Sequence, residues 1–171
     1  MFRLSPLLRS YFVAFVVGVF GAAAAYAATA TQPVNTAASA AENGIIKVKS
    51  KYTFAETVTR LKQDVASKGI KFFDEIDQTQ LAANAGIKLR PSTLLVFGNP
   101  PLGTLFINAN PLAGLDWPVR LLVMQDENGD VWAAYTDFAY IARRHSIQGK
   151  DLDSFKTASG VITSITSSVT K

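Results

Sequence analysis

The sequence predicts an α+β domain in which helices cover one face of a central antiparallel sheet, and three observations lead to this prediction. Thr53 and Glu56 have the spacing of a capping box, and apolar residues follow at helical intervals. Asn128-Gly129 lies between two apolar runs, which is the strongest short signal for a β-hairpin. Residues 151–169 have one apolar and one polar face, as expected for a helix on the outside of a sheet.

The first half of the domain alternates strands and helices. A strand is predicted at residues 45–48, where apolar residues stand between lysines. The helix that begins after Thr53 ends at Lys68-Gly69, because glycine favours helix termination. A second strand is predicted at 70–76 and a short helix at 77–85, capped by Asp77 and ended by Gly86.

The second half contains the predicted hairpin. A strand at 92–98 is followed by a connection over residues 99–117, rich in Pro and Gly and partly helical around 102–109. So long a connection in a compact domain is usually functional or a lid. Strands at 119–125 and 131–136 flank the Asn-Gly turn, and Asp137 caps a short helix that follows.

The N-terminus has the three parts of a secretory signal peptide: Arg3 and Arg9, an apolar run over residues 11–25, and an Ala-x-Ala exit at Ala27. An uncleaved membrane anchor is the alternative. Spanning a bilayer takes ~20 apolar residues, and this run reaches that length only with weakly apolar alanines. We therefore expect cleavage after residue 27, export to the periplasm or medium, and no stable membrane insertion.

The predicted domain boundaries follow from composition. Residues 28–43 hold little bulky apolar surface, so they predict a disordered tether between the signal peptide (1–27) and the domain (44–171). Without the signal peptide the formal net charge falls from +4 to +2, and basic residues alternate with acidic ones. No nucleic-acid partner is expected from that distribution. The chain has no cysteine, which excludes a thiol nucleophile, c-type haem attachment and a thiolate metal site.

Two patterns bear on metal binding. Asp126, Asn128 and Asp130 match the first ligand positions of a calcium loop, but Val131 stands where that loop needs glycine. A plain hairpin turn explains the same residues. His145 is the only histidine, so a zinc site would need carboxylates for its other ligands. We expect neither a metal site nor a cofactor.

His145 and Asp137 are the candidate catalytic residues. A histidine that acts as general base needs an orienting partner, and Asp137 is the nearest candidate in the sequence. The alternative is structural, a histidine at a helix end stabilised by the helix dipole. No Gly-x-Ser-x-Gly motif marks a nucleophile. A hydrolase or isomerase of a small substrate is therefore the second functional hypothesis.

The leading hypothesis is a non-catalytic module that binds a small molecule beside residues 97–103. This loop matches neither a Walker loop nor a dinucleotide fingerprint. In the structural interpretation its glycines permit positive φ and its prolines fix the exit. In the functional one its backbone amides and Asn99 meet an anionic or apolar ligand. The predicted ligand-binding residues are Arg90, Phe97, Gly98, Asn99 and Tyr135. Arg90 alternatively pairs with Asp116 or Glu75.

With these segments placed, the chain resembles the domain of unknown function 302 family over about residues 45–147. The resemblance implies a small α+β fold of the TATA-box-binding-protein type, with a curved antiparallel sheet backed by helices, and no catalytic residues. The chain differs from the family pattern at Trp117 and Phe138, where Leu and Pro are usual. The matching residues are Thr57-Val58, Leu61, Gly69, Ala85-Gly86, Arg90-Pro91, Phe97-Gly98-Asn99-Pro100, Gly103, Trp117-Pro118, Tyr135, Asp137 and the region of His145.

The resemblance also suggests self-association, and we expect a homodimer. Aromatic residues gather in the hairpin and the helix after it, and the dimer would form through a sheet edge or a patch around Trp132 and Tyr140. The alternative is a monomer in which these aromatics belong to the core. Its sheet edge would then be protected by Lys47, Lys49 and Lys51.

Overall fold

The computed structural model describes residues 43–171. The predicted signal peptide and all of the predicted tether except Asn43 lie outside these residues. The elements, in order, are β1 (Ile45–Lys49), α1 (Phe54–Ser67), β2 (Lys71–Asp77), α2 (Gln78–Asn84), β3 (Ser92–Gly98), α3 (Pro100–Ala109), η1 (Pro111–Asp116), β4 (Val119–Gln125), β5 (Val131–Thr136), α4 (Phe138–Arg144), η2 (Gly149–Asp151) and α5 (Leu152–Ser167).

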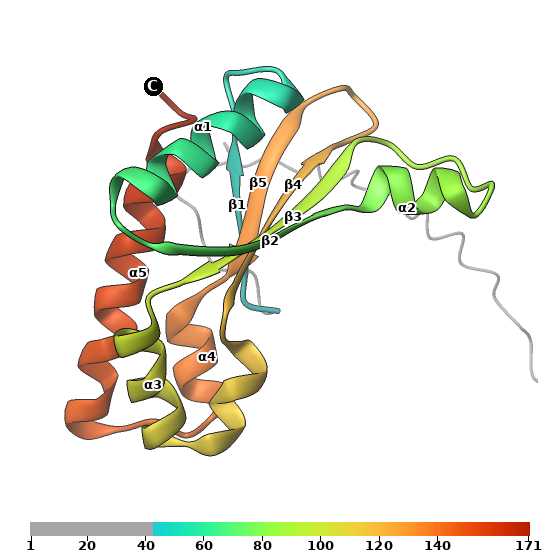
Figure 1. The fold of residues 1–171 in the computed structure, drawn as a ribbon. Helices are drawn as coiled ribbons and strands as arrows, with labels where there is room; N and C mark the ends of the chain where they lie inside the picture. Colours follow the sequence, from blue (N-terminus) through green and yellow to red (C-terminus); the bar gives the residue numbers. More distant parts are fainter. Residues whose placement is uncertain (1–42) are drawn as a thin grey trace, which may run out of the picture. The chain divides into compact units, whose positions relative to one another are not determined.

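The five strands form one antiparallel sheet in the order β1-β5-β4-β3-β2 (Figure 1). Helices back this sheet, as the sequence predicts. The core lies between the sheet and helices α1, α4 and α5, where Leu61, Leu95, Leu121 and Ile165 are fully buried. Among residues 43–171, no helix is both long and apolar enough to cross a bilayer.

Alternation along the strands decides which face is buried. Leu95 pairs with Leu121 and Val123 pairs with Ala133, and all four side chains point to the helix-covered face. The neighbouring pair Leu94–Leu122 points to the other face and is half-buried. On that other face the Lys47 ammonium lies 4.5 Å from the centre of the Trp132 ring.

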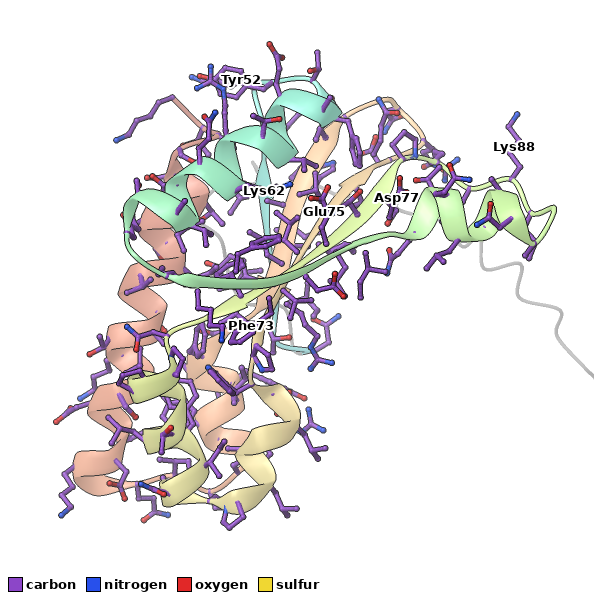
Figure 2. The ribbon with its side chains drawn as sticks, in the orientation of Figure 1. Tyr52, Lys62, Phe73, Glu75, Asp77 and Lys88 are labelled. Carbon is purple, nitrogen blue, oxygen red and sulfur yellow. The ribbon has the colours of Figure 1, made fainter. Side chains whose placement is uncertain are left out.

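The capping box predicted at the start of α1 is present. The Thr53 hydroxyl accepts a hydrogen bond from the Glu56 amide, and the Glu56 carboxylate accepts from the Thr53 amide and hydroxyl. These hydrogen bonds from Thr53 lower the pKa of the Glu56 carboxyl. Further along, Lys62 of α1 and Glu75 of β2 form an ion pair that ties the helix to the sheet (Figure 2).

The connection between β3 and β4 is more regular than predicted. Residues 100–109 form α3 and residues 111–116 form a 3-10 helix, so nearly the whole segment is helical. The cause is local: the side chains of Asn99 and Asn110 each accept from an amide of the following turn, and proline follows both asparagines. The helix predicted around residues 102–109 is therefore present and begins two residues earlier, whereas the 3-10 helix at 111–116 was not predicted.

The predicted β4–β5 hairpin is present, and a single carboxylate organises its turn. Asp126 accepts hydrogen bonds from the amides of Asn128 (3.0 Å) and Asp130 (2.9 Å) and from Trp132 Nε1 (2.8 Å). Gly129 supplies the positive φ of +84° that the turn needs. The residues of the calcium-like pattern thus build this turn.

Candidate functional site

An apolar cavity of about 510 Å³ lies at one end of the sheet. It opens to solvent on one side and is bordered by the end of β3, by α3 and α5, and by the turn between α1 and β2. Its volume falls within the ~300–1,000 Å³ that is usual for small-molecule sites. Its lining residues are Lys68, Ile70, Phe97, Gly98, Asn99, Pro101, Leu102, Gly103, Leu105, Phe106, Trp117, Val119, Phe138, Thr157, Ala158, Val161, Ile162 and Ile165.

Trp117 is held in one wall of the cavity because two glycines leave room for its indole. A Cβ atom on Gly103 would lie 2.1 Å from the Trp117 ring, and one on Gly98 would lie 3.0 Å from it. Phe73 packs edge-on against Trp117, with 5.8 Å between ring centres. Neither Gly98 nor Gly103 has a positive φ. Glycine is therefore needed at these two positions because the indole lies so close, and not because the backbone has an unusual conformation.

Aromatic packing supports the side of the cavity formed by α3 and α5. Phe106 of α3 stacks on Phe155 of α5 with 4.1 Å between ring centres, and it also contacts Phe138 at 5.8 Å. All three rings are buried. Since such pairs add ~0.5–1.5 kcal/mol to their burial energy, they fix the distance between the two helices. The cavity therefore has walls that are formed before any ligand enters.

Few polar groups face the cavity. Lys68 is the one charged residue in its lining, and its ammonium pairs with Asp64 one turn back on α1 at 2.8 Å. Asn99 Oδ1 accepts from the amide of Leu102 at 3.2 Å, while the Thr157 hydroxyl donates to the carbonyl of Asp153 at 2.9 Å. The site is thus an apolar chamber with polar groups at its rim.

The structure brings together three of the five predicted ligand-binding residues. Phe97, Gly98 and Asn99 all line the cavity. Arg90 precedes β3 and lies at the opposite end of this strand, in a separate groove shared with Lys88 and Asn128. Tyr135 is buried in the core and is absent from the lining. Burial raises the pKa of its phenol, against the opposing effect of the Thr163 hydroxyl.

Neither ion pair suggested for Arg90 is formed. Glu75 pairs with Lys62, and Asp116 is surrounded by other cations. Arg144 donates to Asp116 at 3.2 Å, and a guanidinium nitrogen of Arg120 lies 3.6 Å from the same carboxylate. Arg90 belongs to a different surface because a strand of seven residues, ~3.3 Å each, separates it from Asn99.

His145 is buried and hydrogen-bonded to a carboxylate, but that carboxylate is not the predicted one. Its Nε2 lies 2.6 Å from Oδ2 of Asp116. Asp137 caps the first turn of α4 through the amides of Ala139 and Tyr140, whereas His145 follows the last turn. The predicted pairing of His145 with Asp137 is therefore wrong, because the whole length of α4 separates the two side chains.

The His145–Asp116 pair joins α4 to η1. The Asn110 side chain adds a second link by donating to the His145 carbonyl at 2.9 Å. Neither His145 nor Asp116 lines the cavity. With the Arg144–Asp116 ion pair, α4 and η1 are tied at three points, and His145 faces a carboxylate and not the cavity.

Several cavity residues were not identified from the sequence as site residues. Many of them belong to α5, whose apolar stripe includes Ala158, Ile162 and Ile165. The sequence assigns this stripe to packing on the sheet, and part of it does pack there. The one feature of the sequence that could have indicated a cavity beside α5 is the small side chain of Ala158 within this stripe. Nothing in the sequence marked Lys68 as a site residue, because lysine is common at the C-terminal end of helices.

Comparison with known proteins gives one family and one fold. The model of the family "Domain of unknown function DUF302" matches residues 46–165. The structure resembles the crystal structure of an uncharacterised conserved DUF302 protein from Bacillus stearothermophilus, with a TM-score of 0.67 and 17% sequence identity. The similarity covers 74% of this chain and 98% of that one.

Among curated proteins, the chain is similar to two from Brucella named Fluoride-specific ion channel FluC 1. It is 37% identical over 110 residues to the protein from Brucella suis biovar 1 (strain 1330) and to that from Brucella abortus biovar 1 (strain 9-941). The match covers 64% of this chain but only 43% and 41% of these relatives. The chain therefore spans less than half the length of the curated relatives that it matches.

Proposed function

This chain belongs to the DUF302 family, and we propose that it is a non-catalytic module that binds a small, largely apolar molecule. The observation that supports this proposal is the cavity of about 510 Å³ between β3, α3 and α5. Concave, mostly apolar sites with a few polar groups are the usual form of small-molecule sites. An acid/base function is less well supported, because His145 and Asp116 bind each other outside this cavity.

The walls of the cavity support a binding role over a packing defect. Interiors are normally packed without voids much larger than a water molecule, and an unfilled apolar space costs stability. Here the surrounding side chains are fixed by aromatic stacking and by the contact of Trp117 with Gly103. A ligand that fills the space gains apolar contacts without deforming these walls.

An occlusion experiment tests this proposal. Nile red, an apolar dye that fluoresces in apolar surroundings, is titrated into the purified chain and into two variants with one added indole each. Val161→Trp places the indole in the cavity lining, whereas Lys156→Trp places it on the exposed face of α5. We expect dye binding to be lost in Val161→Trp and kept in Lys156→Trp. Equal binding by both folded variants would exclude the cavity as the site.

We propose as a second function that the chain acts beside a membrane channel. The curated relatives are named fluoride-specific ion channels, and the match leaves more than half of their length uncovered. Channels need segments that span the bilayer, and no helix within residues 43–171 meets that requirement. The matched segment would thus form an extramembrane part of these relatives. Deleting the gene for this chain should then raise the fluoride sensitivity of the cells that carry it, and unchanged growth in fluoride would exclude this role.

A further inference from the structure

We infer that the cavity takes a single-chain amphiphile with an anionic head, whose tail fills the chamber and whose head is bound by Lys68. This inference rests on the proposed function and specifies its ligand class. An apolar tail matches the lining, which is mostly apolar. Phe97, Phe106 and Ile165 form its buried part, and Leu105 is half exposed. The anionic head is required by the polar groups that remain available at the rim.

Lys68 is suited to bind such a head. Its ammonium carries three N–H donors, and Asp64 is its one hydrogen-bond acceptor among residues 43–171. Two donors therefore remain for a ligand without breaking the Asp64 contact. The side chain is 30% exposed, so it lies at the boundary between cavity and solvent. A long flexible stem allows the ammonium to follow a head group of varied size.

The polar groups at the rim other than Lys68 are also hydrogen-bond donors, so they favour a ligand that carries acceptors. Asn99 lies beside the α1–β2 turn because β2 and β3 pair Lys71 with Gly98. Its Oδ1 already accepts from Leu102, which leaves the Nδ2 donor for a ligand. The first turn of α3 offers few amides, because positions 100 and 101 are both proline. Lys68 and Asn99 both line the cavity, and each has a donor available for a carboxylate or another oxyanion.

Three ligands with one tail test the head group: dodecanoate, dodecanol and dodecyltrimethylammonium. Each is tested for displacement of Nile red from the purified chain at concentrations below micelle formation. We expect dodecanoate to bind about fivefold more tightly than dodecanol, as for a partly exposed ion pair, and the cation to bind most weakly. Shortening the tail from dodecanoate to decanoate and octanoate should weaken binding about fourfold per buried methylene.

Variants assign the head to Lys68. Lys68→Met keeps the apolar stem and should abolish the preference for dodecanoate over dodecanol. Asp64→Asn removes the competing carboxylate and should strengthen dodecanoate binding while leaving dodecanol unchanged. Lys156→Met is the matched control, because Lys156 pairs with Asp153 on the exposed face of α5; it should behave as the unmodified chain.

The outcomes separate this inference from the proposed function. Equal affinity for dodecanoate and dodecanol, or a preference that survives Lys68→Met, overturns the anionic head and leaves the apolar cavity in place as the binding site. Absence of binding by all three amphiphiles and by Nile red overturns both. A preference lost in Lys68→Met and enhanced in Asp64→Asn supports the assignment.

Discussion

Helices α2 and α3 begin in the same way and end up in different surroundings. Each follows a strand, and each is capped by a side-chain oxygen, that of Asp77 for α2 and that of Asn99 for α3. Yet α2 extends away from the sheet (Figure 1) and buries no residue. Its Leu81 is 58% exposed. Helix α3 packs on α5 through Phe106, which is 2% exposed.

The difference shows what capping signals do and do not determine. A cap satisfies the free amides of a first turn and so fixes where a helix starts. Whether the helix then forms a site depends on partners far away in the sequence. Helix α3 has two such partners, Trp117 and α5, and the cavity lies where the three meet. The partner of α2 is β3, whose Ser92 is hydrogen-bonded to Gln78 and Thr79, and no residue of α2 lines the cavity.

The largest expected effect is at the buried anchor of α3. Phe106→Ala removes a ring that stacks on Phe155 and contacts Phe138, and it should lower the free energy of unfolding by about 3–5 kcal/mol. The matched change on α2, Leu81→Ala, should shift it by less than about 0.5 kcal/mol. Urea unfolding followed by circular dichroism measures both. Comparable losses in the two variants would mean that α2 is packed in solution as α3 is.

A smaller effect is expected at Gly103, where the contact is between side chain and backbone. Gly103→Ala would place a Cβ 2.1 Å from the Trp117 ring, so we expect a loss of about 1–3 kcal/mol from overpacking. Trp117→Leu removes the obstructing ring. The double variant should then lose less than the sum of the single losses, by about 1 kcal/mol.

A second glycine provides the control for this measurement. Nothing lies within 4 Å of a Cβ placed on Gly160 in α5, so Gly160→Ala should raise stability by about 0.5–1 kcal/mol through helix propensity alone. If the losses of Gly103→Ala and Trp117→Leu simply add, the contact between the two residues does not shape the cavity wall.

Much of the fold follows from short-range patterns in the sequence. The bounds of β3, β4 and β5 agree with prediction, because alternation and turn residues define strands within a few positions. The helicity of residues 100–116 was underestimated, since Pro and Gly were taken as interruptions. The prolines in fact occupy first turns, where no amide is needed, and Gly103 makes room for Trp117.

The candidate site was predicted only where it is local. Phe97, Gly98 and Asn99 are consecutive, so a prediction that places one of them in the site places all three there. Arg90 was grouped with them by closeness in sequence, but an intervening strand carries it to the other end of the sheet. The partner of His145 was missed for the converse reason. Asp116 is 29 residues away, and only the packing of α4 against η1 brings it within 2.6 Å.

The smallest change in stability that we expect is at the β4–β5 turn, which hydrogen bonds to Asp126 stabilise. The hydrogen bond from Trp132 Nε1, followed by those from the Asp130 and Asn128 amides, lowers the pKa of the Asp126 carboxyl below its ordinary value of 3.8. The unfolded chain therefore binds a proton at a higher pH than the folded one does. Asp126 contributes stability that is complete above about pH 4 and is lost as the pH falls through the lowered pKa.

Urea midpoints measured at about pH 5 and about pH 2.5 should differ less in Asp126→Asn than in the unmodified chain. Glu127→Gln, an exposed change in the same turn, should keep the full difference. If Asp126→Asn keeps it as well, the turn does not depend on this carboxylate. The stability difference between the two pH values must then arise from other carboxylates.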